Sequence, residues 1–246
     1  MSDYVSSQIR LDKLELSKKQ VYTIEESDIL VVDTLIMRDS SKIVLNYLKQ
    51  DNIITAKVFV VGMGCSIIGN GVNGPNGKTG EAGSSNTAPC TVAKDARNGY
   101  NGLPGANGLN LSLYLEKVVF NGNITISLNG GDGGTGGAGG KGGIGGAATK
   151  FCSSADGGKG GNGGNGANGG RGGNLTIKCT ECPELYLIQD DRLLIRVHGG
   201  FAGNAGDAGK GGYRGSGKGN SKNGLNGTPG LNGKEGKRGT VVYSRN

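Results

Sequence analysis

Five cysteines and a single histidine are the residues of this chain with the most distinctive chemistry. Cys179 and Cys182 form the motif Cys-Thr-Glu-Cys, a spacing typical of redox disulfides and of half a zinc site. A structural zinc ion is usually held by four ligands, and the chain could add only His198 from histidine. We therefore expect a local disulfide or two buried thiols at these cysteines, and no metal.

Cys90 and Cys152 lie in the first and second of three segments that we interpret as loops between glycine-rich runs. If the two loops lie at the same end of the molecule, their Cα atoms could come within the ~7 Å that a disulfide requires. Cys90 and Cys152 are therefore candidates for a disulfide, and Cys65 would be left over. In a reducing compartment all five cysteines would stay as thiols.

Catalytic motifs are hard to find in this sequence. A nucleophilic triad would have to use His198, which ends the apolar segment Leu-Leu-Ile-Arg-Val and is more typical of a structural histidine beside a turn. Matches to Gly-x-Gly-x-x-Gly are expected by chance inside glycine repeats. We predict a protein that is not an enzyme and that uses no cofactor.

Composition sets the next limits. The chain has 246 residues, of which 52 are glycine and none is tryptophan, whereas glycine usually makes up about 7% of a protein. The first residues do not show the basic and then apolar pattern of a secretory signal. No apolar stretch approaches the ~20 residues that cross a bilayer, so we expect no membrane span.

The net charge of +7 is concentrated near the C-terminus. The region from Gly199 onward has eight basic residues against Asp207 and Glu235. Such an excess favours anionic partners, so an anionic polymer is one expected partner of the basic C-terminal runs. The alternative is that these charges only keep a glycine-rich surface soluble.

Two regimes divide the chain. Residues 1–68 contain only Gly62 and Gly64 and show short alternating or β-branched segments, which are typical of strands. We predict a β-rich N-terminal attachment or capping domain there, folded as a small β-sandwich or β-roll. Residues 69–246 form the second predicted domain, which is rich in glycine.

The second domain repeats one pattern, in which glycine recurs every third residue. Strand pairs are expected at 111–128 and 174–197, and loops at 84–98, 148–156 and 216–223. Three residues per turn is the period of polyproline II. The predicted fold class is mostly β plus irregular, with strand pairs leading into a six-helix polyproline-II (polyglycine-II) bundle. The six glycine runs are 71–83, 99–108, 130–146, 157–173, 199–215 and 224–239.

Some runs carry two glycines in each triplet and others carry one. Runs 130–146 and 157–173 are mostly Gly-Gly-X, which leaves two faces without side chains, so we expect them in the interior. An alanine should be tolerated at Thr135 and should be disruptive at a glycine beside it. The glycines predicted to be structural are Gly133, Gly136, Gly137, Gly160, Gly163 and Gly206.

These triplet runs resemble the polyglycine-II bundles of phage tail-fibre tip adhesins and the six-helix bundles of springtail antifreeze proteins. The segment "VHGGFAGNAGDAGKGG" is similar in texture to the glycine-rich N-terminal domain of Obg-family GTPases, but no GTPase P-loop follows it. The organisation also resembles uncharacterised glycine-rich bacterial surface proteins. The resemblance covers residues 69–240 and rests on periodicity, so it implies architecture more than function.

The expected function is that of a non-enzymatic surface, structural or adhesion protein at the cell or virion surface. A rigid scaffold would present its loop tips to a cell-surface glycan or protein, and self-association into a fibre or oligomer is a further expectation. Two alternatives stay open, ice binding and receptor binding at a phage tail-fibre tip. Long charged side chains in the runs count against a flat ice-binding face. The residues predicted at the binding tips are Tyr100, Phe151, Tyr213 and Arg214.

Overall fold

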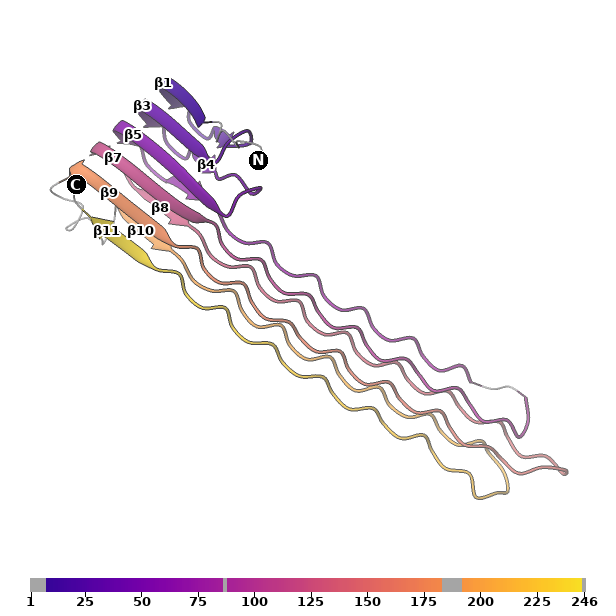
Figure 1. Ribbon diagram of the computed structural model, residues 1–246. Helices are drawn as coiled ribbons and strands as arrows, with labels where there is room; N and C mark the ends of the chain where they lie inside the picture. The colour runs from indigo at the N-terminus through magenta and orange to yellow at the C-terminus, as the bar shows by residue number, and fades with distance from the viewer. Residues whose placement is uncertain (1–7, 86–87, 183–191, 245–246) are drawn as a thin grey trace, which may run out of the picture.

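The computed structural model describes residues 8–85, 88–182 and 192–244, and its regular elements are eleven β-strands (Figure 1). Strands form where β-branched and aliphatic residues alternate with polar ones, as in Ile-Leu-Val-Val-Asp-Thr-Leu-Ile-Met. The strands are β1 (Gln8–Leu16), β2 (Val21–Thr23), β3 (Ile29–Met37), β4 (Lys42–Val44), β5 (Asp51–Val61), β6 (Cys65–Ile68), β7 (Asn110–Phe120), β8 (Ile124–Ser127), β9 (Leu175–Glu181), β10 (Leu193–Arg196) and β11 (Val241–Ser244).

All the strand pairs are parallel, and the strands divide between two sheets by parity. The odd strands form a six-stranded sheet in the order β1-β3-β5-β7-β9-β11, and the even strands form a five-stranded sheet in the order β10-β8-β6-β4-β2. Each odd strand and the even strand after it therefore make one coil, and successive coils stack on one another. The last strand, β11, adds to the first sheet alone.

The hydrophobic core lies between the two sheets. Side chains alternate between the two faces of a strand, and the inward set of β3, for example, includes Leu30, Leu35 and Met37, all fully buried. The facing sheet contributes Ile43 and Ile67. Apolar residues of all five coils join this one cluster, so the stacked coils form a continuous body.

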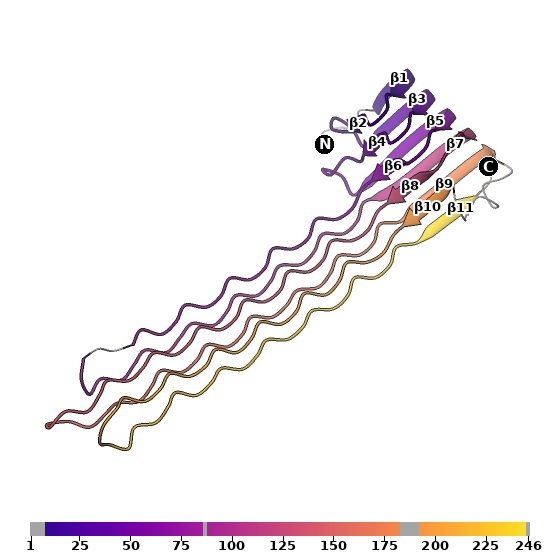
Figure 2. The ribbon, with the colours of Figure 1, turned by 180° about the vertical axis from the view of Figure 1, so that it is seen from behind.

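The coils differ in the length of one connection, the one that joins an even strand to the next odd strand. The first two of these connections are short, at 24–28 and 45–50, whereas the next three span 69–109, 128–174 and 197–240. Each long connection runs out from the sheets and returns, so that six glycine-rich segments lie side by side (Figures 1 and 2). We call these six segments the shaft.

The shaft has three layers, each made of one outgoing and one returning segment. The first layer contains 69–85 and 91–109, the middle layer 128–147 and 154–174, and the third layer 197–215 and 221–240. Backbone amides join the layers at every third residue. For example, the Gly74 N–H donates to the Asp132 carbonyl at 2.7 Å, and the Gly133 N–H donates to the Phe201 carbonyl at 2.9 Å.

The middle layer has hydrogen-bonded neighbours on both sides, which explains its paired glycines. The Gly136 N–H donates to the Asn204 carbonyl of the third layer, and the Gly137 N–H donates to the Tyr100 carbonyl of the first layer. A Cβ on Gly136 would overlap the carbonyl of Gly164 in the returning segment of the same layer, and one on Gly137 would overlap that of Lys78 in the first layer. Only glycine allows the backbones to approach this closely.

Asparagine side chains form a ladder on the exposed sides of the shaft. The side-chain oxygen of an asparagine in one layer accepts a hydrogen bond from the backbone N–H of the equivalent residue in the next layer. Asn101 accepts from the Asn165 N–H at 2.7 Å, and Asn165 accepts in turn from the Leu231 N–H at 2.9 Å. The ladder thus provides acceptors for backbone N–H groups of the non-glycine residues, such as those of Asn165 and Leu231.

The ladder continues the register of the sheets. Asp51 of β5 pairs with Asn110 of β7, and 59 residues separate them. The Asn73 side chain and the Asp132 N–H are bonded across the same separation of 59 residues. The strands therefore set the alignment of the segments that extend from them.

Replacing Asn165 tests the ladder. Asn165→Leu removes the acceptor of the Leu231 N–H, and we expect a loss of about 1 kcal/mol in the free energy of unfolding. Asn165→Asp keeps an acceptor oxygen, as Asp132 does naturally when it accepts from the Phe201 N–H, so its unfolding midpoint in urea should stay close to that of the parent protein. Equal losses in both variants would show that the side-chain oxygen is unimportant.

The third layer has a cap instead of a fourth layer. In the middle layer, the equivalent backbone N–H groups of the outgoing segment donate to the third layer. In the third layer, asparagine side chains of the returning segment accept hydrogen bonds from three of these N–H groups at 2.7–2.9 Å. These pairs are Ala205 with Asn232, Gly211 with Asn226, and Arg214 with Asn223. The cap satisfies three of the backbone donors through which a further layer could otherwise bond.

The predicted fold class is wrong. We expected a β-sandwich or β-roll followed by six polyproline-II helices, but the described residues contain no helix, and their regular elements are parallel strands in two sheets. The prediction made each glycine run a separate helix of a bundle. Each run is instead half of an elongated corner of a coil, and the adjoining strands set its register. Strands do occur in residues 1–68, but the sheets continue past residue 68, where we had placed a domain boundary.

Candidate functional site

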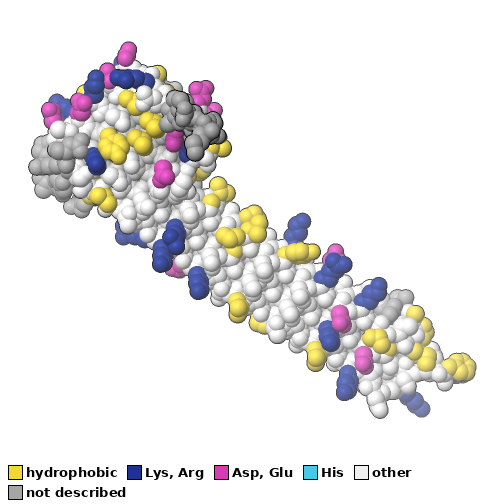
Figure 3. Space-filling model, viewed as in Figure 1, with side chains coloured by type: hydrophobic (Ala, Val, Ile, Leu, Met, Phe, Trp, Pro, Cys, Tyr) yellow, Lys and Arg dark blue, Asp and Glu magenta, His cyan; other side chains and the backbone are white. Residues whose placement is uncertain are grey.

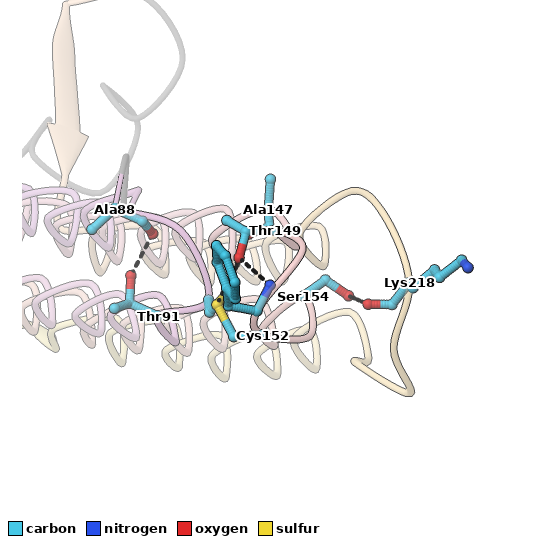
Figure 4. Close-up of a disulfide and its surroundings, with 9 residues drawn as sticks. Ala88, Thr91, Ala147, Thr149, Cys152, Ser154 and Lys218 are labelled. Atoms are coloured by element: carbon cyan, nitrogen blue, oxygen red, sulfur yellow. Dashed lines mark hydrogen bonds between the residues drawn. A yellow bond between two sulfur atoms is a disulfide. The ribbon is translucent and has the colours of Figure 1, made fainter.

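The ends of the three long connections meet at the distal end of the shaft, and a disulfide joins the first two (Figure 4). Cys90 and Cys152, the candidate pair, are bonded with their Cα atoms 6.0 Å apart. The Cys90 N–H also donates to the Ala147 carbonyl at 3.0 Å. Thr149 holds the second turn, because its N–H donates to the Cys152 carbonyl at 2.9 Å and its hydroxyl lies 3.2 Å from the Cys152 sulfur.

Hydrogen bonds join the second and third turns. The Ala148 N–H donates to the Ser216 carbonyl at 2.8 Å, and the Ser154 N–H donates to the Lys218 carbonyl at 3.0 Å. The hydroxyls of Ser154 and Ser221 lie 2.7 Å apart. Three turns that are distant in the sequence therefore form one connected surface, which we call the tip.

Phe151 is the most exposed large hydrophobic residue among those described. Its side chain is 96% exposed, although it lies between Thr149 and the bonded Cys152. The Phe151 N–H donates to the Thr149 hydroxyl at 3.1 Å, which fixes the backbone from which the ring projects. Aromatic residues, Phe included, are enriched at protein interfaces, so Phe151 is a candidate contact residue.

The other predicted contact residues lie on the shaft. Tyr213 and Arg214 occupy the last triplet before the third turn, where Tyr213 is 71% exposed and the Arg214 N–H donates to the Asn223 side chain. Tyr100 lies further from the tip, since its N–H donates to the Lys78 carbonyl in the first layer. The first loop is also shorter than expected, because the Arg97 N–H already donates to the Glu81 carbonyl.

The predicted structural glycines all lie at close backbone contacts. A Cβ at any of them would overlap a backbone carbonyl of a neighbouring segment. The carbonyls concerned are those of Ala167 for Gly133, Gly164 for Gly136, Lys78 for Gly137, Gly209 for Gly160, Gly206 for Gly163 and Gly137 for Gly206.

The remaining cysteines and the histidine have structural surroundings. Cys179 and Cys182 form a disulfide at the end of β9, and Cys65 is a buried thiol whose sulfur lies 3.3 Å from the Arg38 carbonyl. The His198 N–H donates to the Asn129 side chain at the start of the third layer. Within the described residues no group of three or more His, Cys, Asp or Glu could hold a metal ion, and no helix there is long and apolar enough to cross a bilayer.

A groove of about 790 Å³ lies along the side of the shaft near the tip. The groove lies over the outgoing segment of the third layer. Backbone hydrogen bonds join this segment to the middle layer on one side and to the returning segment of the third layer on the other. Charged and hydrophobic side chains are scattered along the shaft surface (Figure 3). The residues that line the groove include Lys141, Ile144, Lys210, Tyr213, Asn223, Leu225 and Asn226.

Sequence reasoning missed this groove. Lys141 and Lys210 are 69 residues apart, as are Ile144 and Tyr213, and the ladder bond between Asp132 and Phe201 spans the same 69 residues. Aligning the third run on the second with this offset would have placed the two lysines side by side. The signal was present, but it required the register of the strands.

Comparison with known proteins gives no relative from which a function could be transferred. No protein-family model matches the chain, and neither the curated proteins nor the solved structures include a significant match.

Proposed function

We propose that this protein is a non-enzymatic surface or adhesion protein whose shaft carries a rigid tip away from the sheets and presents it to a cell-surface glycan or protein. The observation that carries the proposal is the tip itself. Three turns from different coils are joined by the Cys90–Cys152 disulfide and by backbone bonds, and Phe151 projects from them. Binding residues are commonly placed on loops that a rigid scaffold positions.

The disulfides support a location outside the reducing cytoplasm. Disulfides form and persist mainly in oxidising environments, and two are present in the described residues. An extracellular or cell-surface site, or the surface of a virion, fits this chemistry. A tip closed by a covalent bond would keep its shape in that setting.

Phe151→Ala tests the proposal. The side chain is almost fully in water, so the variant should keep the unfolding temperature of the parent protein, while binding to target cells should fall by about tenfold or more, as expected for an aromatic anchor. Fluorescently labelled protein and flow cytometry on a panel of bacterial and animal cells would measure the binding.

Phe201→Ala is the matched control, because Phe201 is also exposed, at 71%, but lies at the opposite end of the shaft, near the sheets. It should bind cells like the parent protein. If Phe151→Ala bound as well as the parent protein, or if both variants lost binding equally, the tip would not be the contact surface.

A further inference from the structure

The groove near the tip contains two lysines that form no ion pair with a carboxylate of the described residues. Lys141 and Lys210 occupy equivalent positions in adjacent layers, which are bonded there because the Gly142 N–H donates to the Lys210 carbonyl at 2.9 Å. None of the ion pairs among the described residues includes either lysine. Positive charges at two adjacent positions repel each other, and an anion between the two lysines would relieve that repulsion.

Apolar surface lies beside these charges. Ile144 and Tyr213 are aligned one triplet further along, where the Gly145 N–H donates to the Tyr213 carbonyl at 3.0 Å. Leu225 lines the groove from the returning segment and is 70% exposed. A tyrosine ring combines a flat apolar face with a polar hydroxyl, so it can pack against the C–H face of a sugar ring and bond to a hydroxyl group.

The groove also presents fixed amide donors. The Asn223 and Asn226 side-chain oxygens accept bonds from the backbone N–H groups of Arg214 and Gly211 at 2.9 Å. Each side chain is therefore held in place, and its NH₂ group remains as a donor. Preorganised donors of this kind suit hydroxyl-bearing ligands, because little side-chain freedom is lost on binding.

We propose that this groove binds a short acidic oligosaccharide. A carboxylate or sulfate group would lie between Lys141 and Lys210, and a sugar ring would pack on Tyr213 beside Leu225. This inference rests on the proposed function and names the class of ligand that the distal shaft recognises.

Charge along the groove favours a saccharide over a nucleic acid strand. The triplet before the two lysines has Ala138 in the middle layer and Asp207 in the third layer. A polynucleotide needs a continuous basic track and a series of stacking residues, whereas here the basic stretch ends at a carboxylate and the lining contains one aromatic ring, Tyr213. A ligand with a single acidic group at this point and neutral hydroxyls elsewhere fits better.

Isothermal titration calorimetry with four probes tests the proposal. The probes are hexagalacturonate, a heparin hexasaccharide, neutral maltohexaose and a six-nucleotide thymidine strand. We expect one of the acidic sugars to bind about tenfold or more tightly than maltohexaose and the oligonucleotide, a difference of ~1.4 kcal/mol. Preference between the two acidic sugars would tell whether the anion is a carboxylate or a sulfate.

Variants assign the binding to the groove. Lys141→Gln combined with Lys210→Gln should weaken acidic-sugar binding by about tenfold, and Tyr213→Leu should weaken it while leaving the charge unchanged. Lys234→Gln combined with Lys237→Gln removes the same charge from exposed positions of the returning third-layer segment, nearer the sheets, and should have no effect. Unfolding temperatures should be unchanged, because all of these side chains are exposed.

Several results would overturn the inference. They are equal binding of maltohexaose, tighter binding of the oligonucleotide, no binding of any probe, or an equal loss in the control variant, which would indicate diffuse charge. These outcomes are separate from a failure of the proposed function, because the Phe151→Ala experiment measures whole-cell binding through the tip. Loss of cell binding in that variant with unchanged sugar titration would support both proposals, because Phe151 is not among the residues that line the groove.

Discussion

Gly136→Ala should destabilise the protein by about 3 kcal/mol or more, at the upper end of the effects of overpacking. The added methyl would overlap the Gly164 carbonyl and push apart two segments that are bonded through many rows. Gly137→Ala should cost a similar amount on the opposite side, where the overlap is with the Lys78 carbonyl. Strain of this kind cannot relax locally, because each segment is tied to its neighbours at every third residue.

Thr135→Ala is the control for both variants, since Thr135 is partly exposed and should tolerate the change within about 0.5 kcal/mol. Thermal unfolding should show the midpoint falling by about 6–12 °C in the glycine variants, from the usual 2–4 °C per kcal/mol for a chain of this size. Limited proteolysis should detect cleavage between 128 and 174 before the sheets are cut. Equal stability of the three variants would contradict the close contacts of the middle layer.

Removing the disulfide at the tip should have the second large effect. Cys90 and Cys152 are 62 residues apart in the sequence, and in the chain-entropy model a cross-link over that distance stabilises a protein by about 4 kcal/mol. Cys90→Ser combined with Cys152→Ser should therefore lower the free energy of unfolding by an amount approaching this value. Urea unfolding with and without a reducing agent measures it.

Reduction provides an internal control. The parent protein should lose most of this stability when a reducing agent is added, whereas the double variant should respond weakly. Its remaining disulfide, between Cys179 and Cys182, closes a sequence separation of only three residues, so it restricts the unfolded chain much less. If the double variant unfolded at the same urea concentration as the parent protein under oxidising conditions, the bond at the tip would have no stabilising role.

Local composition predicted the parts of the molecule that depend on local chemistry. Glycine at every third residue indicated extended segments in close backbone contact, and the paired glycines of 130–146 and 157–173 correspond to the layer with neighbours on both sides. The position of Cys90 and Cys152 between runs suggested that their loops could meet. In each case the prediction depends on which side chain a position carries, or on its having none.

The direction of the strands could not be read in the same way. Alternation in Gln8–Leu16 or Ile29–Met37 shows which residues face a core, but it is the same for an antiparallel sandwich and for stacked parallel coils. The four residues between β1 and β2 would suit a hairpin as well as the corner of a coil. Only the pairing of β1 with β3 decides between them.

Tyr100 was misplaced for a related reason. Residues 94–98 lack the glycine triplet, and this absence predicts that the first loop extends through them. In the structure Ala96 and Arg97 use their backbone N–H groups like the rest of the shaft, donating to Lys159 and Glu81 carbonyls. Side chains are accommodated there because the first layer has a neighbouring layer on one side only.

The absence of long connections from the first two coils has a consequence for the order of folding. Gln8 pairs with Ile29 and Ile29 with Ile53, separations of 21 and 24 residues, whereas later coils pair across 59, 64 and 66 residues. Closing a longer loop costs more entropy and slows folding. The N-terminal coils should therefore assemble first and provide the edge on which each later coil pairs, so that the glycine segments become ordered only after both of their flanking strands are in place.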